Sequence, residues 1–223
     1  MMEPTTVATP TKLRVDVWAD VVCPWCYLGE HRLSRAIETS PHADHIEVEV
    51  HAFQLDPDAP AAVAPTLQYL AAKLGAPQAQ ARAVEEGMAR TVEAEGLRYA
   101  VDRSVGNTRS MLRLVQYGAE QGIAFAYLRA MQAEVFSGSP DAFEHATLVR
   151  LGEELGLPGD GIRDVLSTDR YADAVRADQE QAVGLGVTGV PFTVVGRRLG
   201  IPGAASIERY SDAIDQVWEE TNG

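Results

Sequence analysis

The chain has 223 residues, of which 46% are hydrophobic and 23% charged, and its 32 acidic and 19 basic side chains give a net charge of −13. This composition is typical of a globular protein and excludes collagen-like and largely disordered chains. An excess of acidic groups repels phosphate, so we expect neither nucleic acid nor an anionic membrane surface as a partner. The sequence has no run of about 18 consecutive apolar residues, so we expect no transmembrane helix.

The N-terminal segment, residues 1–11, is rich in threonine and proline. It has neither the basic nor the apolar stretch of a secretory signal, so we expect a flexible tail and a cytoplasmic protein. The chain contains two cysteines, Cys23 and Cys26. In a reducing compartment, a C-x-x-C pair is more often redox-active or metal-binding than a structural cross-link.

The first predicted elements form a β-α-β unit. Apolar and polar residues alternate over residues 13–17 and again over residues 46–53, which is the pattern of a half-buried strand. Between them, Leu28 and Leu33 follow a helical period that runs from the cysteines to about Ser40. The two cysteines therefore lie at the junction between a strand and a helix.

A long helical block follows. Residues 54–64 break the alternation, and the next ~120 residues carry only helical periods. The predicted helices cover residues 67–74, 81–92, 111–115, 125–136, 148–155, 162–166 and 171–183. Asn107 is a candidate N-cap for one of them, and Asp141 with Glu144 has the spacing of a capping box for another.

Strand signals return near the C-terminus. Residues 192–195 are a β-branched run, and a turn leads to a short return strand at residues 199–201. Ser206 can then cap a last helix over residues 207–218. The chain thus reads as β-α-β, a helical block, and β-β-α.

Strands that are separated by helices usually share one sheet. We therefore expect one α/β domain made of residues 12–62 and 184–223, into which residues 63–183 are inserted as an all-helical domain. Two independent domains are the alternative.

A C-x-x-C pair at the start of a helix suits disulfide exchange. Cys23, at the cap, lies beside unpaired backbone N–H groups at the positive end of the helix dipole, which favour its thiolate. Cys26 lies a turn deeper and is stabilised less, so we expect Cys23 to attack and Cys26 to resolve the mixed disulfide. Pro24 fits the first helical turn, and Trp25 offers an apolar surface beside the reactive sulfur.

A metal site is the competing interpretation of the two cysteines. A structural zinc site takes four ligands, usually including a second cysteine or histidine pair. The sequence has no second C-x-x-C and no H-x-x-x-H pair. His42 and His45, beside Pro41, are expected to be solvated, and we expect no metal.

A second signal is the segment Gly186-Val187-Thr188-Gly189-Val190-Pro191-Phe192. A proline directly before a strand removes a ladder donor, which is unusual inside a sheet. A cis Val190–Pro191 bond beside the active site is one explanation. An ordinary trans loop proline is the other, since only about 5–6% of such bonds are cis. The residues alone leave both open.

Together, Cys-Pro-Trp-Cys after a strand and Gly-Val-Pro-Phe before another resemble the DsbA-type thioredoxin-fold family. Residues 20–29, Asp-Val-Val-Cys-Pro-Trp-Cys-Tyr-Leu-Gly, are similar to the FrnE branch of its disulfide oxidoreductases. The resemblance covers about residues 13–220. It includes the segments Phe53-Gln54-Leu55-Asp56-Pro57, Asn107-Thr108 and Gly203-Ala204.

The resemblance implies an α/β, thioredoxin-like fold interrupted by a helical insertion. It also implies a cis Val190–Pro191 bond that forms, with Gly189, Pro24 and Trp25, a substrate platform next to Cys23. The implied activity is thiol–disulfide exchange with protein thiols or disulfides, or with a small thiol or quinone-like molecule, linked to aromatic polyketide biosynthesis. No cofactor is implied beyond the cysteine pair and glutathione as an optional co-substrate, and a monomer is expected.

Two positions depart from the family pattern. Glu30 stands where a basic residue is usual; a carboxylate there would oppose the Cys23 thiolate, although a solvated helix glutamate is our expectation. Met111 stands where a histidine is usual and is expected to lie in the core. A further acidic residue, Asp20, is expected to cap the active-site helix, with proton acceptor for Cys26 as its alternative role.

Two other functions stay open. Kappa-class glutathione transferases and hydroxychromene carboxylate isomerases resemble the same architecture but typically have serine in place of the first cysteine, and this chain has both cysteines. The chain could instead be an accessory protein that binds a biosynthetic enzyme. For an oxidoreductase, the direction of exchange depends on the reduction potential, which spans about −270 to −120 mV in this fold.

Overall fold

The main sheet is built from both ends of the chain. The computed structural model describes residues 12–222, so the tail predicted for residues 1–11 lies outside the described residues. The sheet has the order β2-β1-β5-β6 and consists of β1 (Leu13–Ala19), β2 (Ile46–Ala52), β5 (Phe192–Val195) and β6 (Leu199–Pro202). β1 is parallel to β2, β5 is antiparallel to β1, and β6 is antiparallel to β5. The expected sheet that spans the helical block is confirmed.

Helix α1 (Pro24–Thr39) connects β1 to the short 3₁₀ turn η1 (Ala43–His45) and then to β2. Pro24 takes the first helical position, where its missing N–H costs nothing. Ser40 ends the helix with an extended backbone, as expected for the residue before a proline. The helix therefore begins directly after Cys23, as the sequence predicts.

The histidine pair after α1, which we expected to be solvated, is only partly exposed. The rings of His42 and His45 are half-buried against Trp218 near the C-terminus, with 4.2 Å between the His42 and Trp218 ring centroids. The sequence did not indicate this partial burial, because the partner ring lies far away in the sequence.

The inserted segment is mostly helical. Its helices are α2 (Thr66–Leu74), α3 (Gln78–Glu93), α4 (Arg109–Ala119), α5 (Ala124–Phe136), α6 (His145–Glu154), α7 (Gly159–Ser167) and α8 (Ala172–Gly184). It also contains a short antiparallel pair, β3 (Ala64–Pro65) with β4 (Ser104–Val105), which corrects the all-helical expectation. Strands of two residues are too short to leave a period in the sequence.

Two predicted caps differ from those in the structure. Helix α6 begins at His145, and the side chain of its N-cap residue, Glu144, makes no capping bond. The chain before α6 forms a turn instead, in which the Glu144 N–H donates to the Asp141 carbonyl. For α4, the N-cap position is Thr108, and Asn107 accepts the N–H of Arg109 from one residue earlier. Ser206 does cap the last helix, α9 (Ile207–Asn222), by accepting the N–H of Arg209.

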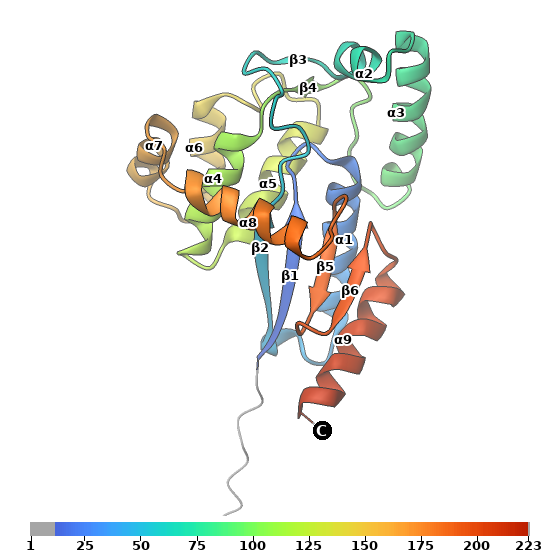
Figure 1. Ribbon diagram of the computed structural model, residues 1–223, viewed down its shortest axis with the longest axis vertical. Coiled ribbons are helices and arrows are strands. Elements are labelled where there is room, and N and C mark those ends of the chain that lie inside the picture. The colour runs from blue at the N-terminus through green and yellow to red at the C-terminus, as the bar shows by residue number, and fades with distance from the viewer. Residues whose placement is uncertain (1–11, 223) are drawn as a thin grey trace, which may run out of the picture.

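The helical insertion packs directly on the sheet. Helices α4 and α8 contact β2, and α1 contacts both α9 and α5. Figure 1 shows α8 crossing in front of the sheet, α1 behind it, and α2 and α3 at the far end of the molecule from the C-terminus. One hydrophobic core joins Val15 and Val17 of β1 to Leu112 and Leu114 of α4. This is a thioredoxin-like fold with a helical insertion, whereas the domain boundaries stay predictions.

Within residues 12–222, no helix is long and apolar enough to cross a bilayer.

Candidate active site

Cys23 is the N-cap of α1. Its Sγ accepts the backbone N–H of Cys26 at 3.3 Å, and its carbonyl accepts the first helical N–H, from Tyr27, at 3.0 Å. The first turn, from Pro24 to Tyr27, contains no acidic side chain that would oppose a negative sulfur. The helix N-terminus therefore offers a hydrogen bond and a favourable dipole to a thiolate at Cys23.

The segment around Pro191 faces the same sulfur. The Val190–Pro191 bond is cis. Of the two alternatives, cis and trans, this is the one that the resemblance implied. The Cys23 thiol donates to the Val190 carbonyl, with 3.5 Å between Sγ and the oxygen. Two segments that lie far apart in the sequence thus meet at one sulfur atom.

Gly29 allows Pro191 to pack closely on α1. A Cβ at position 29 would lie 2.9 Å from Cγ of Pro191 and 3.4 Å from Cα of Ala204. A larger residue would therefore push the Pro191 loop away from the cysteines. Gly29 belongs to the motif that carries the resemblance, but the sequence alone did not indicate this packing role.

The sulfur of Cys26 is fully buried. The residue is 0% exposed. Burial raises the pKa of the Cys26 thiol well above its usual value, and the neighbouring Cys23 and Glu30 raise it further. A thiol in such a place is a poor first nucleophile for an external disulfide.

Asp20 does not cap the helix. Its carboxyl accepts the backbone N–H of Val21 and that of Leu55, each at 2.8 Å, and Cys23 itself occupies the cap position. Burial raises the pKa of Asp20 to about 6, despite hydrogen bonds from Leu55, Thr108 and Val21 that lower it. The capping expectation was wrong because the carboxyl is turned toward the loop after β2.

Glu30 is not solvated either. It is 1% exposed, and Nε2 of Gln132 in α5 donates to its Oε2 at 2.5 Å. Burial raises its pKa well above the usual value, more than the hydrogen bond from Gln132 lowers it. Our expectation that Glu30 is solvated was wrong because α5 covers this face of α1. Met111, by contrast, lies in the core as expected.

The predicted substrate platform combines covered and open residues. Trp25 is 50% exposed and Gly189 is exposed, whereas Pro24 and Val190 are partly covered and Pro191 is buried. An incoming chain would therefore meet Trp25 and Gly189 first.

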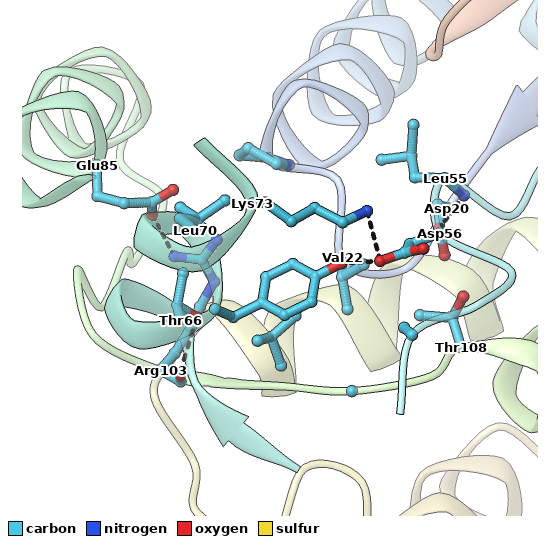
Figure 2. A pocket seen from close by; sticks show the side chains of 15 residues that line it. Asp20, Val22, Leu55, Asp56, Thr66, Leu70, Lys73, Glu85, Arg103 and Thr108 are labelled. Atoms are coloured by element: carbon cyan, nitrogen blue, oxygen red, sulfur yellow. Dashed lines mark hydrogen bonds and ion pairs between the residues drawn. The ribbon is translucent and has the colours of Figure 1, made fainter. Parts of the chain in front are cut away.

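A pocket of about 240 Å³ lies beside the cysteine loop. It extends from Asp20, Val22 and Pro24 to α2 and β4 of the insertion. Figure 2 shows Lys73 reaching toward Asp56 on one side and Glu85 facing Arg103 on the other. The lining also includes the following apolar side chains: Val22, Pro24, Leu55, Leu70 and Val105. A small, largely apolar group fits such a surface.

Three side chains could group around a cation at another place. The ligand atoms of Asp16, Glu49 and His51 lie within 4.8 Å of one another. The Arg14 guanidinium forms ion pairs with both Asp16 and Glu49. The positive charge that a metal would bring is therefore already supplied by Arg14.

Sequence reasoning missed Gln132 and Thr108, which the insertion contributes to the site. Gln132 interrupts the buried apolar positions Leu128, Met131 and Val135 of α5. A polar residue within such a stripe was the available signal. Its partner, Glu30, lies 102 positions away and could not be named from the pattern.

Comparisons with known proteins place this geometry in context. The family model described as "DSBA-like thioredoxin domain" matches residues 14–215. A crystal structure of a probable DsbA oxidoreductase from Streptomyces coelicolor has 39% sequence identity to the chain and a TM-score of 0.85, and covers 93% of this chain and 91% of its own. An uncharacterized protein of Bacillus subtilis, YwbO, is 26% identical over 214 residues, which is 91% of this chain and 96% of that protein.

A more distant structure shares the fold alone. A 2-hydroxychromene-2-carboxylate isomerase has 19% identity and a TM-score of 0.65, covering 93% of this chain and 97% of its own.

Proposed function

The chain belongs to the DsbA-like thioredoxin domain family, and we propose that it catalyses dithiol–disulfide exchange with Cys23 attacking and Cys26 resolving. The observation that carries the proposal is the setting of Cys23. Its sulfur lies at the N-terminus of α1, accepts the Cys26 N–H at 3.3 Å and faces the carbonyl before the cis proline. Cys26 is buried, so it is better suited to attack the mixed disulfide at Cys23 than to attack an external disulfide.

The exchange is balanced in two steps. The Cys23 thiolate attacks a substrate disulfide, forms a mixed disulfide and releases one substrate thiolate. Cys26 then loses its proton and attacks the Cys23 sulfur, which closes the Cys23–Cys26 disulfide and releases the second thiolate. The substrate gains two electrons and the protein loses two. The reverse sequence oxidises a dithiol substrate, and the reduction potential decides between the two directions.

We propose that the substrate platform receives an extended chain or a small molecule. Trp25 and Gly189 are exposed beside the covered Pro191, so substrate backbone can approach Val190 from the open side. The neighbouring apolar pocket of about 240 Å³ can take an apolar side chain or small group next to Pro24. Both features suit protein thiols or disulfides, and the pocket also suits a small thiol or quinone-like substrate.

Two finer parts of the proposal come from residues 20–29. Their similarity to the FrnE branch supports membership of that branch and a link to aromatic polyketide biosynthesis. A cytoplasmic monomer completes the proposal. None of these parts is needed for the exchange chemistry.

Serine variants of the two cysteines test the function. With reduced ribonuclease A in a glutathione redox buffer, Cys26→Ser should lose turnover and accumulate a mixed disulfide at Cys23 that mass spectrometry detects. Cys23→Ser should form no mixed disulfide, because the attacking sulfur is absent.

The same variants separate the alternatives. Full activity of Cys26→Ser would contradict dithiol exchange and favour a glutathione-dependent isomerase, which needs no resolving thiol. A partner that binds the double serine variant as tightly as the native chain, with no exchange activity in either, would favour the accessory-protein alternative.

A further inference from the structure

The pocket beside the cysteine loop lies under one face of α2. Four residues of this helix line the pocket at spacings of three and four: Thr66, Tyr69, Leu70 and Lys73. These spacings place them on one side of the helix. A cavity under a helix face gives that face fewer atoms to pack against. The main packing partners of α2 are α3, β3 and β4, all within the insertion. Polar contacts across the pocket therefore matter for the position of α2.

Asp56, in the loop after β2, makes such a contact with α2. Its Oδ2 lies 2.5 Å from Nζ of Lys73 and also accepts the hydroxyl of Tyr69. Figure 2 shows the Lys73 side chain extending from α2 to Asp56. Lys73 and Tyr69 both lower the pKa of Asp56, so the carboxylate stays charged. We call Asp56, Tyr69 and Lys73 the clasp.

The loop that carries Asp56 is fixed independently of the clasp. The N–H of Leu55 donates to the buried carboxyl of Asp20 at 2.8 Å. The carbonyl of Asp56 accepts the N–H of Ala59 at 3.1 Å, and the side-chain amide of Asn107 donates to the carbonyl of Ala59 at 3.0 Å. This loop therefore stays beside the cysteines whether the clasp is closed or open.

Helix α2, by contrast, is anchored at its first turn. The backbone N–H and the hydroxyl of Thr66 both donate to the carbonyl of Arg103, at 2.8 and 2.7 Å. The N–H of Leu67 donates to the side chain of Asp102 at 3.2 Å. The clasp residues of α2 lie about one and two turns further along the helix. Release of the clasp would let that end of α2 move away from the cysteine loop while its first turn stays in place.

The clasp is suited to open and close. The side chain of Lys73 is 49% exposed and that of Asp56 is 21% exposed, and an ion pair in contact with water is weak and screened by salt. With the clasp closed, the pocket of about 240 Å³ is smaller than the roughly 300–1,000 Å³ of pockets that hold drug-sized ligands. It fits one apolar side chain or small group, and a longer stretch of polypeptide needs α2 to move.

We propose that the clasp sets the size of substrate that reaches Cys23: closed, it favours small disulfides, and its opening admits a polypeptide. This inference rests on the proposed dithiol exchange and names the residues that select its substrates. A polypeptide that enters beside Pro24 binds the open fraction of the molecules, so its rate falls in proportion to that fraction. A small disulfide reacts with the closed form as well. Asp56 and Lys73 are therefore specificity-determining residues of the exchange.

The ratio of two rate constants tests the inference. Reduced protein is mixed with insulin or with bis(2-hydroxyethyl) disulfide, and the loss of the Cys23 thiol is followed by alkylation and mass spectrometry. Asp56→Asn, which keeps the size of the side chain and removes its charge, should raise the insulin-to-small ratio about three- to fivefold, an effect within reach of one partly exposed ion pair. Lys73→Met, which breaks the same pair from the other side, should raise the ratio by a similar factor.

These two variants separate the clasp from charge steering. They change the net charge in opposite directions, so steering would move the two ratios in opposite directions. The clasp moves both ratios upward. In the double variant the effect should be smaller than the product of the two single effects, because both substitutions break one contact. A native ratio in both single variants, or ratios that move in opposite directions, would overturn the inference.

Two control variants match the substitutions. Asp58→Asn removes an exposed carboxyl two residues after Asp56 and should keep the native ratio. Lys12→Met changes the other lysine of the sequence, which pairs with Glu47 on β2, and should also keep the native ratio. An increase in either control as large as that in the clasp variants would also overturn the inference.

Hydrogen exchange reports on α2 without any catalysis. In Asp56→Asn and Lys73→Met, peptides that cover residues 67–74 should exchange faster than in the native chain, whereas peptides from α1 should not change. Unchanged exchange in α2 would contradict the clasp even if the rate ratios moved. If the native chain reacts with neither disulfide, the proposed function itself fails, which is a distinct result.

Discussion

At the scale of single residues, three carboxyl and thiol groups are buried together around one helix start. Cys26, Glu30 and Asp20 are each at most 1% exposed. Burial raises the pKa of all three, so this site is arranged to keep protons rather than to lose them. Cys23 differs from these three groups because its sulfur accepts a backbone N–H of the helix, that of Cys26. The asymmetry between the two sulfurs follows from position, since both belong to the same short motif.

Asp20 should make the protein less stable as the pH rises. Its pKa is about 6 in the folded state, above the unfolded value of 3.8, so folding favours the protonated form. The stabilising contribution is complete below pH 3.8 and is lost as the pH rises through 6, which amounts to about 3 kcal/mol. Asp20→Asn should remove this dependence.

Urea unfolding of the reduced protein at about pH 4 and pH 7 measures the effect. The free energy of unfolding of Asp20→Asn should change less between the two pH values than that of the native chain. Asp215→Asn, an exposed carboxyl on α9, is the control and should follow the native chain. Identical pH dependence in Asp20→Asn and the native chain would show that Asp20 titrates normally.

The site could be read from the sequence only where its parts are local. Cys23 and Cys26 share one motif, and Pro191 is marked by its place before a strand. Glu30 and Asp20 were assigned to the wrong surroundings because their burial depends on Gln132 and Leu55, which come from other elements. Spacing along one helix shows which residues share a face but not what covers that face.

At the scale of elements, a charged cluster connects β2 to the insertion helix α8. His51 of β2 contacts Asp16 of β1 at 2.8 Å through Nε2 and Asp178 of α8 at 3.0 Å through Nδ1. The second oxygen of Asp178 accepts the backbone N–H of Ala52 at the end of β2. His51 also stacks on Trp18, which tilts against Phe192, the residue after the cis proline. The cluster therefore holds α8 beside the strands that carry the site.

His51 should stabilise the fold below about pH 9. Burial lowers its pKa, but hydrogen bonds to Asp16 and Asp178 outweigh burial and raise the pKa to about 9. Because this folded value lies above the unfolded value of 6.5, the contribution is complete below pH 6.5 and is lost as the pH rises through 9. It amounts to about 3 kcal/mol.

His51→Gln should remove most of this loss, because glutamine does not titrate. Thermal unfolding between about pH 6.5 and pH 9.5 is the measurement, with the exposed His145→Gln as the control. A native chain whose unfolding temperature shows the same pH dependence as His51→Gln would contradict a charged His51 in the cluster.

The elements themselves were largely predictable. Each strand of the main sheet and each long helix was expected from its period, and α2 ends at Gly75 in a left-handed conformation with φ of 59°, as a helix-stopping glycine does. The β3–β4 pair and the starts of α4 and α6 were not, because two-residue ladders and caps depend on contacts that leave no repeating pattern.

At the scale of the whole molecule, one core extends from the sheet into the insertion. The active-site helix α1 packs against both α9 and α5, so residues of the insertion lie within the site. The pocket in Figure 2 lies at the same junction and is lined by residues from both parts. Residues of the insertion therefore line the pocket beside the cysteine loop.

The net charge of −13 should influence which substrates react fastest. The reduced protein should react faster with cystamine, a cationic disulfide, than with the anionic dithiodiglycolate. Each rate is first divided by the rate at which the same disulfide reacts with a neutral small thiol. The ratio should decrease with added salt, because the screening length falls from about 10 Å at 0.1 M to about 3 Å at 1 M. A ratio that does not change with salt would contradict charge steering.

A redox titration tests whether Cys23 and Cys26 exchange electrons as a pair. The protein is equilibrated in buffers with different ratios of reduced to oxidised glutathione, and free thiols are trapped by alkylation and counted by mass. We expect a reversible two-electron transition in which both thiols disappear together and the Cys23–Cys26 disulfide forms. A chain that keeps both thiols free in every buffer, while binding glutathione, would contradict this expectation.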